Sequence, residues 1–211
     1  LKSEGMLIKW NQGKSLGNKP PLPTAPNQKW HTDLMYLKID DQFYYYQAVI
    51  DAYSRYIIAW DIHAEGSALN TSLLLQEAFD SSPQDITPDI VADNGKEFIG
   101  KEFREVVAKN NGKKIKIKAY HPQSNGIDER HHRSLREECT NHVHFSNLIE
   151  AKNKVAQWIS HYNHSRLHSA IDYMPPIIWH QGNPQVLKAE RNVKIKLASE
   201  QRKAINLKQV S

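Results

Sequence analysis

Three carboxylate side chains occupy positions where an acid is chemically informative. Asp33 lies in WHTDLMYLKI (30–39), whose aromatic and β-branched residues predict a strand. Asp93 directly follows the apolar segment PDIVA (88–92), and Glu129 lies in the polar stretch HPQSNGIDER (121–130). Mg²⁺ prefers carboxylate oxygens, so three such acids brought together could hold magnesium.

Asp33 shares one face of its strand with apolar side chains. At a period of two residues its neighbours on that face are His31, Met35, Leu37 and Ile39. An acid on such a face is costly unless it is paired or binds a cation. A salt bridge to a buried base is the structural alternative.

Asp93 ends a predicted strand and precedes Asn94-Gly95, a pair that favours a tight turn. In open α/β sheets, ligands bind beyond the carboxyl ends of the strands. The position therefore suits a ligand-binding acid. It also suits an ordinary residue of a turn that ends a strand.

Glu129 and its neighbour Asp128 lie at the start of a predicted helix. Asn125 is a good helix N-cap, and both acids would be favourable in the first turn, so capping alone could explain them. Glu129 lies roughly 120° from the expected apolar stripe of Leu135, Cys139 and Val143, at about 100° per residue. It shares a ridge instead with Arg133 and Arg136, which would suit a phosphate backbone.

The remaining elements predict a mixed sheet. Further strands are expected at 43–50, 55–62, 88–92 and 114–119, and helices at 67–79, 94–110, from about Asp128, and at 148–162. Ser67 is a plausible cap of the first helix, whose expected apolar positions include Leu69, Leu73, Leu74 and Phe79. The order β-β-β-α-β-α-β-α-α favours three antiparallel strands followed by crossover connections, with helices on both faces.

Composition narrows the class of protein. The 211 residues include one cysteine, Cys139, which excludes an internal disulfide framework and a cysteine-rich zinc module and favours a reducing compartment. No apolar run approaches a membrane span, and no signal peptide is evident. The net charge of +5 lies entirely in residues 185–211, which contain seven basic and two acidic residues. Such a tail favours a polyanionic partner, or simply improves solubility.

The acids are also spaced in a characteristic way, with 35 residues between Asp93 and Glu129. Together with five ordered motifs, this spacing resembles the DD(35)E catalytic core of retroviral-type integrases and bacterial insertion-sequence transposases. The motifs are WHTDLMYL, VIDAYSRYIIAWDI, VADNGKEF, HPQSNGIDERHHRSLREE and YNHSRLHSAIDYMPP, which together span about residues 30–176.

The resemblance implies an α/β, RNase H-like fold with a five-stranded mixed sheet flanked by helices. It implies that Asp33, Asp93 and Glu129 are both the catalytic acids and the ligands of two Mg²⁺ ions, for which Mn²⁺ would substitute. Asp33 is the expected bridging ligand. Asp128 is not expected to be catalytic, and Asp51 of the IDAYSR segment is expected to be structural.

The implied activity is metal-dependent cleavage of DNA 3′ ends followed by strand transfer, without a covalent protein intermediate. The expected partners are element-end and target DNA and further copies of the chain, in the bacterial cytoplasm near the nucleoid and without a membrane. Residues expected to contact DNA are Lys96, Arg133, Arg136, Lys114, Lys116 and Lys118. The lysines of KKIKIK could instead guard a sheet edge against aggregation.

The expected organisation is a linker or extended arm over residues 1–28, a catalytic core over 29–180 and a basic C-terminal extension over 181–211. A separate N-terminal DNA-recognition unit is expected to precede the core in the natural protein.

Other functions are compatible with the same residues. A related metal nuclease could hydrolyse DNA without joining it, and a decayed element could persist as a DNA-binding module. His161, His164 and His168 could share a helical face as a zinc site. The resemblance instead places them in the closing YNHSRLH motif, where packing is expected.

Overall fold

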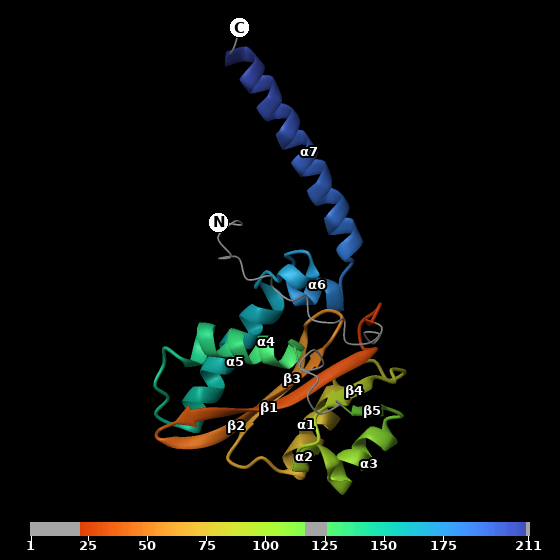
Figure 1. The fold of residues 1–211 in the computed structure, drawn as a ribbon, viewed down its shortest axis with the longest axis vertical. Helices are drawn as coiled ribbons and strands as arrows, with labels where there is room; N and C mark the ends of the chain where they lie inside the picture. The colour runs from red at the N-terminus through yellow and green to blue at the C-terminus, as the bar shows by residue number, and fades with distance from the viewer. Residues whose placement is uncertain (1–21, 117–125, 210–211) are drawn as a thin grey trace, which may run out of the picture.

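A five-stranded mixed sheet forms the centre of the structure, a computed structural model that describes residues 22–116 and 126–209 (Figure 1). Its strands are β1 (Lys29–Ile39), β2 (Gln42–Asp51), β3 (Ile57–His63), β4 (Asp89–Ala92) and β5 (Lys113–Lys116). The first three are antiparallel neighbours, and β4 and β5 join them in parallel, in the order β3-β2-β1-β4-β5. The predicted hairpins and parallel crossovers are therefore confirmed.

Helices cover both faces of this sheet (Figure 1). One face carries α1 (Ala68–Asp80), α2 (Lys96–Ile99) and α3 (Lys101–Lys109), and the other carries α4 (Gly126–Leu135) and α5 (Leu148–His164). Alternation along β1 supplies both cores. Trp30 packs with α1 and α3, whereas Met35, Leu37 and Ile39 pack with α4 and α5. Asp33 shares the second face, as its spacing predicts.

The helix α1 begins where the sequence indicates, but a different side of it is buried. The Ser67 hydroxyl accepts a hydrogen bond from the backbone N–H of Asn70, which confirms the predicted cap. Leu69 and Leu73 are more than half exposed, however, and the buried side chains include Leu74, Leu75, Ala78 and Phe79. The predicted stripe combined residues from two sides of the helix, because a run of leucines does not show which side packs.

The single helix predicted over 94–110 is divided at Gly100. This glycine is extended, with φ −55° and ψ 159°, and it separates α2 from α3. A Cβ at this position would lie 2.5 Å from the Cβ of Ala68 at the start of α1. A glycine is needed there because α1 approaches so closely, and the break follows from that contact.

The helix that carries Glu129 is shorter than its predicted apolar stripe. It ends at Leu135, and a π-helical turn follows over Arg136–Thr140. Leu135 is fully buried, whereas Cys139 is half-buried and Val143 lies beyond the helix, 37% exposed. The predicted stripe thus holds for Leu135 and for Cys139, which packs against the same core, and is wrong at Val143, because the helical turns end at Thr140. Asn125, the expected cap, lies outside the described residues.

The basic C-terminal segment is helical. After a 3₁₀ turn (Ser169–Ile171) and the short α6 (Pro176–His180), α7 runs from Pro184 to Gln209 and extends away from the sheet (Figure 1). Its first turns bind the body through Lys188, which pairs with Asp172, and Arg191, which donates to the Asp172 and Tyr173 carbonyls. In the described ranges, no helix has the length and apolar character needed to cross a membrane.

Candidate active site

Asp33 and Asp93 lie beside one another on neighbouring parallel strands. The pairing of β1 with β4 matches Lys29 with Asp89 and His31 with Val91. Continued by two residues, this register places Asp33 opposite Asp93, which follows the last residue of β4. In each acid Oδ1 accepts a backbone hydrogen bond, from Leu34 at 2.9 Å and from Gly95 at 2.7 Å. These bonds orient the two carboxylates.

The surroundings of Asp33 are strongly negative. Burial, together with the charges of Asp128, Asp93 and Glu97, raises the pKa of Asp33 to about 7, against a smaller lowering by the Leu34 bond. The side chain is about one quarter exposed, so solvent reaches it. Close carboxylates raise one another's pKa because their negative charges repel, and a bound cation would relieve that repulsion.

Asp128 and Glu129 point in different directions from α4. Asp128 is 2% exposed, and its Oδ2 lies 3.0 Å from Nδ1 of His31 on β1. Glu129 is exposed and lines a groove of about 360 Å³, here called the α4 groove. The groove is lined by Glu129, His132, Arg133, Arg136, Glu137 and Asn141. The prediction that Glu129 avoids the core and shares a ridge with the two arginines is therefore confirmed.

His132 connects the α4 groove with Asp33. It lines the groove, and its Nδ1 lies 4.0 Å from Oδ2 of Asp33. Burial lowers the pKa of His132 to about 4, despite the opposing charge of Asp128. A neutral imidazole thus lies between Asp33 and the ridge of Glu129. In the described parts of the chain, no three Asp, Glu, His or Cys residues are grouped closely enough to hold a metal ion.

Sequence reasoning missed three residues around this site. His31 is two residues from Asp33 on the same strand face, His132 is one helical turn after Glu129, and Glu97 is four residues after Asp93. In each case the spacing in the sequence could have indicated the residue. The pairing of His31 with Asp128 could not be predicted in this way, because it joins residues 97 positions apart.

The residues expected to contact DNA have different surroundings. Lys96, Arg133 and Arg136 are exposed. Lys114 turns toward α2, where its ammonium group donates to the carbonyl of Phe98 at 2.6 Å and lies 5.5 Å from the ring centre of Phe103. The backbone of Lys116 belongs to β5, and Lys118 lies outside the described residues.

Two family models, both described as "Integrase core domain", match residues 23–122 and 112–176. Together they cover the whole sheet, α4 and α5. The chain belongs to the integrase core family. The resemblance drawn from the five motifs is therefore confirmed.

Named relatives of this integrase core include bacterial transposases. The transposase for insertion sequence element IS904 of Lactococcus lactis is 26% identical over 157 residues, which are 72% of this chain and 61% of that protein. The putative transposase InsK for IS150 of Escherichia coli is 23% identical over 154 residues, which are 73% of this chain and 54% of that protein. The chain thus spans little more than half the length of these curated relatives.

The fold of the integrase core is also shared with solved structures. The HTLV-2 integrase catalytic core domain, solved with magnesium in a trimeric form, superimposes with a TM-score of 0.60 at 16% identity, over 75% of this chain and 99% of that one. A dimeric form of the same domain gives a TM-score of 0.53 at 18% identity. The predicted RNase H-like fold is confirmed.

The closing motif YNHSRLH packs the integrase core together. The Asn163 side chain bonds both the N–H and the carbonyl of Ile57, at 2.9 Å each. Arg166 donates to both carboxylate oxygens of Glu138, and His168 packs edge-on against Tyr162. His161 and His164 are exposed on α5. The histidines of the zinc alternative therefore do not form a metal-binding group within the described residues.

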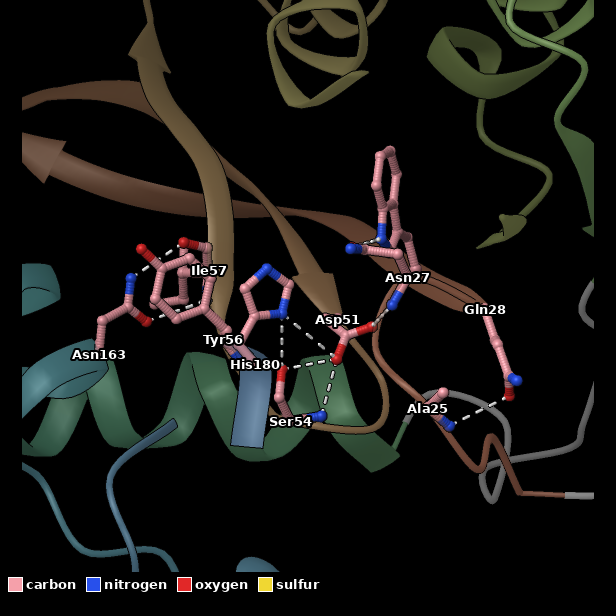
Figure 2. A network of polar contacts seen from close by, with 10 residues as sticks. Ala25, Asn27, Gln28, Asp51, Ser54, Tyr56, Ile57, Asn163 and His180 are labelled. Atoms are coloured by element: carbon pink, nitrogen blue, oxygen red, sulfur yellow. Dashed lines mark hydrogen bonds and ion pairs between the residues drawn. The ribbon is translucent and has the colours of Figure 1, made fainter. Parts of the chain in front are cut away.

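Asp51 is structural, as predicted. It is fully buried, and its carboxylate accepts hydrogen bonds from Asn27, from the Ser54 N–H and from the Ser54 hydroxyl (Figure 2). Ser54 also contacts Nδ1 of His180, whose ring stacks on Tyr56 at 4.5 Å. The network joins the segment before β1, the β2–β3 turn and α6, and its centre, Asp51 and Ser54, is shielded from solvent.

Proposed function

We propose that this integrase core catalyses the DNA cleavage and strand-transfer steps of a bacterial insertion-sequence transposase. The observation that carries the proposal is the register that sets Asp33 beside Asp93 at the carboxyl end of β4, within an integrase core. Transposase names among the curated relatives favour DNA of a mobile element as the substrate.

The proposed catalytic residues are Asp33, Asp93 and Glu129. The first two each leave one carboxylate oxygen outside their backbone hydrogen bonds, and burial together with nearby negative charges raises the pKa of Asp33. An all-oxygen donor set in such surroundings suits Mg²⁺, and Mn²⁺ would substitute. Two bound divalent ions would supply an activated nucleophile and neutralise charge on the phosphate and the leaving oxygen. Asp33 is the proposed ligand of both ions.

Glu129 completes this set from α4. The exposed side chain lies on the solvent side of His132, one turn earlier on the same helix. A different rotamer of Glu129 would move its carboxylate without moving α4. The helix itself is held against β1 by the contact of the buried Asp128 with His31. We therefore assign Glu129 as the third acid and Asp128 as the residue that positions α4.

The α4 groove is the proposed path of the DNA backbone. Arg133 and Arg136 line it beside Glu129, and Lys96 lies at the start of α2, three residues after Asp93. Contacts of this kind are largely independent of sequence and weaken as salt concentration rises. Lys116 and Lys118 stay in the proposed set, whereas the contacts of Lys114 with Phe98 and Phe103 favour a structural role.

The proposal includes self-association in the bacterial cytoplasm. Solved relatives are described in dimeric and trimeric forms, and the curated relatives come from bacteria. Two DNA ends must be joined to one target, which favours an assembly with more than one catalytic core. Light scattering with and without DNA measures this directly.

A strand-transfer assay tests the proposed function. The purified protein is incubated with duplexes that carry the terminal repeats of its own element, with or without a nick at the element end, in Mg²⁺, Mn²⁺ or EDTA. Joined product that depends on metal supports the proposal. Metal-dependent hydrolysis without joining would assign a nuclease instead, and no metal-dependent cleavage at all would leave only a DNA-binding module.

A further inference from the structure

A second cavity lies on the other side of α4 from the groove that contains Glu129. It has a volume of about 590 Å³, and we call it the arginine cavity. Its walls come from β1, β4, β5, the β2–β3 turn, the start of α4 and the segment after α5. The residues that matter below are Arg55, Arg130, Arg166, Ile127, Tyr162 and Tyr173.

Arg55 is a half-buried cation with no side-chain hydrogen bond or ion pair to the residues that the structure describes. Its Nη1 atom is shielded from solvent and makes no hydrogen bond to any residue that the structure describes. Burial lowers the pKa of its guanidinium, against weak support from Tyr162, Asp51 and Asp128. Both of these acids are already bonded elsewhere, Asp51 to Ser54 and Asp128 to His31. An uncompensated buried charge is strongly unfavourable, so a site of this kind calls for an anion.

The backbone conformation of Arg55 is also energetically unfavourable. Its φ of 67° is in the left-handed region, which an arginine seldom adopts. The neighbouring turn is fixed by Asp51. Its carboxylate accepts from the Ser54 N–H, as Figure 2 shows, and its carbonyl accepts from the Arg55 N–H. The fold therefore holds the Arg55 side chain in the cavity wall in spite of both penalties.

Other features make the cavity positive. Arg130 contributes an exposed guanidinium from α4, while Arg166 is already neutralised by Glu138. The first residues of α4, Gly126 and Ile127, also line the cavity, and the N-terminal end of a helix carries partial positive charge. Two unneutralised arginines and a helix start together favour a phosphate group.

Part of the cavity lining is apolar and aromatic, and we call this part the apolar wall. Ile127, Leu167, Tyr162 and Tyr173 contribute to it. A cavity of this volume accommodates a small organic ligand, and an aromatic side chain offers a surface on which a nucleobase can stack. A cavity lined by both arginines and aromatic side chains matches the phosphate and the base of a nucleotide.

We propose that the arginine cavity binds one unpaired nucleotide of the DNA substrate, its phosphate at Arg55 and Arg130 and its base on the apolar wall. The inference rests on the proposed function and deepens it. Helix α4 separates the cavity from Glu129 by about one helix diameter, ~10 Å. That distance is about three base steps along a DNA strand, so one DNA end reaches both sites. The cavity would hold a nucleotide flanking the cleaved phosphate.

Binding measurements in EDTA test the inference separately from catalysis. Fluorescence anisotropy follows a short labelled oligothymidylate on the wild type, Arg55→Met and Arg130→Gln. Loss of a charged hydrogen bond should weaken binding by about tenfold or more in each variant. Arg104→Gln is the control, because Arg104 is exposed on α3 at the other face of the sheet. Its affinity should equal that of the wild type.

Thermal unfolding separates a ligand site from a structural arginine. Met keeps an unbranched, flexible apolar stem at position 55 and removes the guanidinium charge, so Arg55→Met should unfold at the same temperature as the wild type or higher. Should Arg55→Met fail to fold, Arg130→Gln alone decides the outcome, because its side chain is exposed. Wild-type affinity in every folded variant, or losses no larger than in Arg104→Gln, would overturn the inference.

Two further ligands identify what occupies the cavity. An abasic oligomer of equal length keeps the phosphates but lacks the bases, and it should bind more weakly to the wild type. Equal binding would overturn the assignment of the apolar wall to a base. Inorganic phosphate should compete poorly; if it binds more tightly than the oligonucleotide, the cavity serves free anions and the assignment to DNA is overturned.

The same variants distinguish this inference from the proposed function. Suppose the wild type performs strand transfer, and Arg55→Met binds the oligonucleotide and joins DNA as well as the wild type does. That result would refute nucleotide binding in the arginine cavity and leave the proposed function intact. Oligonucleotide binding that requires Arg55, in a protein without metal-dependent cleavage, would keep the cavity and refute the catalytic proposal.

Discussion

Nδ1 of His31 lies 3.0 Å from Oδ2 of Asp128, and this contact joins β1 to α4 in the interior of the integrase core. Both side chains are nearly fully buried, and Asp33 follows His31 by two residues. The same pair therefore sets the position of the strand that carries the first acid and of the helix that carries Glu129.

Replacement of Asp128 should separate positioning from chemistry. Asp128→Asn keeps an acceptor for His31 and should retain most strand-transfer activity. Asp128→Ala leaves a buried imidazole without its partner and should lower the free energy of unfolding by ~1–3 kcal/mol. Urea unfolding and the joining assay measure both effects. An Asp128→Asn protein that folds normally but has no activity would make Asp128 the third acid.

Glu129→Gln should fold as the wild type does and lose activity. The side chain is exposed and makes no contact that the core depends on, so no stability change is expected. Loss of a metal-binding carboxylate should lower the rate of joining by at least ~100-fold, since metal stabilisation of the transition state contributes several kcal/mol.

Glu137→Gln provides the matched control, because Glu137 is an exposed acid in the same α4 groove. It should join DNA at the wild-type rate. Retained nicking or joining by Glu129→Gln would refute the assignment of Glu129.

Asp33 should make the metal-free protein less stable as pH rises. Its pKa is raised from 3.8 to about 7, so the folded state holds the proton more tightly than the unfolded chain. The stability that this proton contributes is complete at acidic pH and is lost as pH rises through about 7. In EDTA at about pH 8, Asp33→Asn should therefore be more stable than the wild type by ~1–3 kcal/mol.

Added Mg²⁺ should raise the unfolding temperature of the wild type and have little effect on Asp33→Asn, because the variant lacks a ligand. Asp85→Asn, which changes an exposed acid in a loop, should match the wild type in both tests. An Asp33→Asn variant whose stability in EDTA follows the same pH dependence as the wild type between pH 5 and 8 would contradict the raised pKa.

The places of the three proposed catalytic acids in the fold could be predicted from the sequence because they follow local rules. Alternation in β1 puts Asp33 on a face with Met35 and Leu37, and the turn after β4 marks Asp93. The β-β-β-α-β-α order then fixes the mixed sheet. These features depend on residues close together in the chain. The spacing of Asp93 and Glu129 then indicated the integrase family.

Features that depend on distant contacts could not be found in this way. The break at Gly100 follows from the approach of Ala68, and the exposure of Leu69 and Leu73 from which side of α1 meets the sheet. The position of His132 beside Asp33 likewise appears only when separate elements pack together. The same holds for the Arg55 guanidinium, whose Nη1 atom is buried without a hydrogen bond to any residue in the described part of the chain.

Acid should destabilise the core through His131. The side chain is buried, its Nε2 lies 2.8 Å from the Tyr46 hydroxyl, and burial holds its pKa well below 6.5. The unfolded chain takes up a proton first as pH falls below 6.5, so stability is lost in that direction. His132 and His168, each with a pKa of about 4, act with the same sign.

His131→Phe should flatten this acid dependence by up to ~1.4 kcal/mol per pH unit, the slope of one proton. The measurement is the urea midpoint between about pH 4 and 7. His142→Phe, at an exposed position, should keep the wild-type slope. An unchanged slope in His131→Phe would show that this histidine titrates normally.

Asn163 should be the most sensitive polar residue of the closing motif. Its buried amide bonds the N–H and the carbonyl of Ile57 at the start of β3, as Figure 2 shows. Asn163→Ala leaves both backbone groups unsatisfied at ~1–3 kcal/mol each, so the free energy of unfolding should fall by ~2–6 kcal/mol. Asn153→Ala, at an exposed position of the same helix, should change it by less than ~0.5 kcal/mol. Equal stability of the two variants would mean that water replaces the lost amide, and that β3 does not depend on α5 for its start.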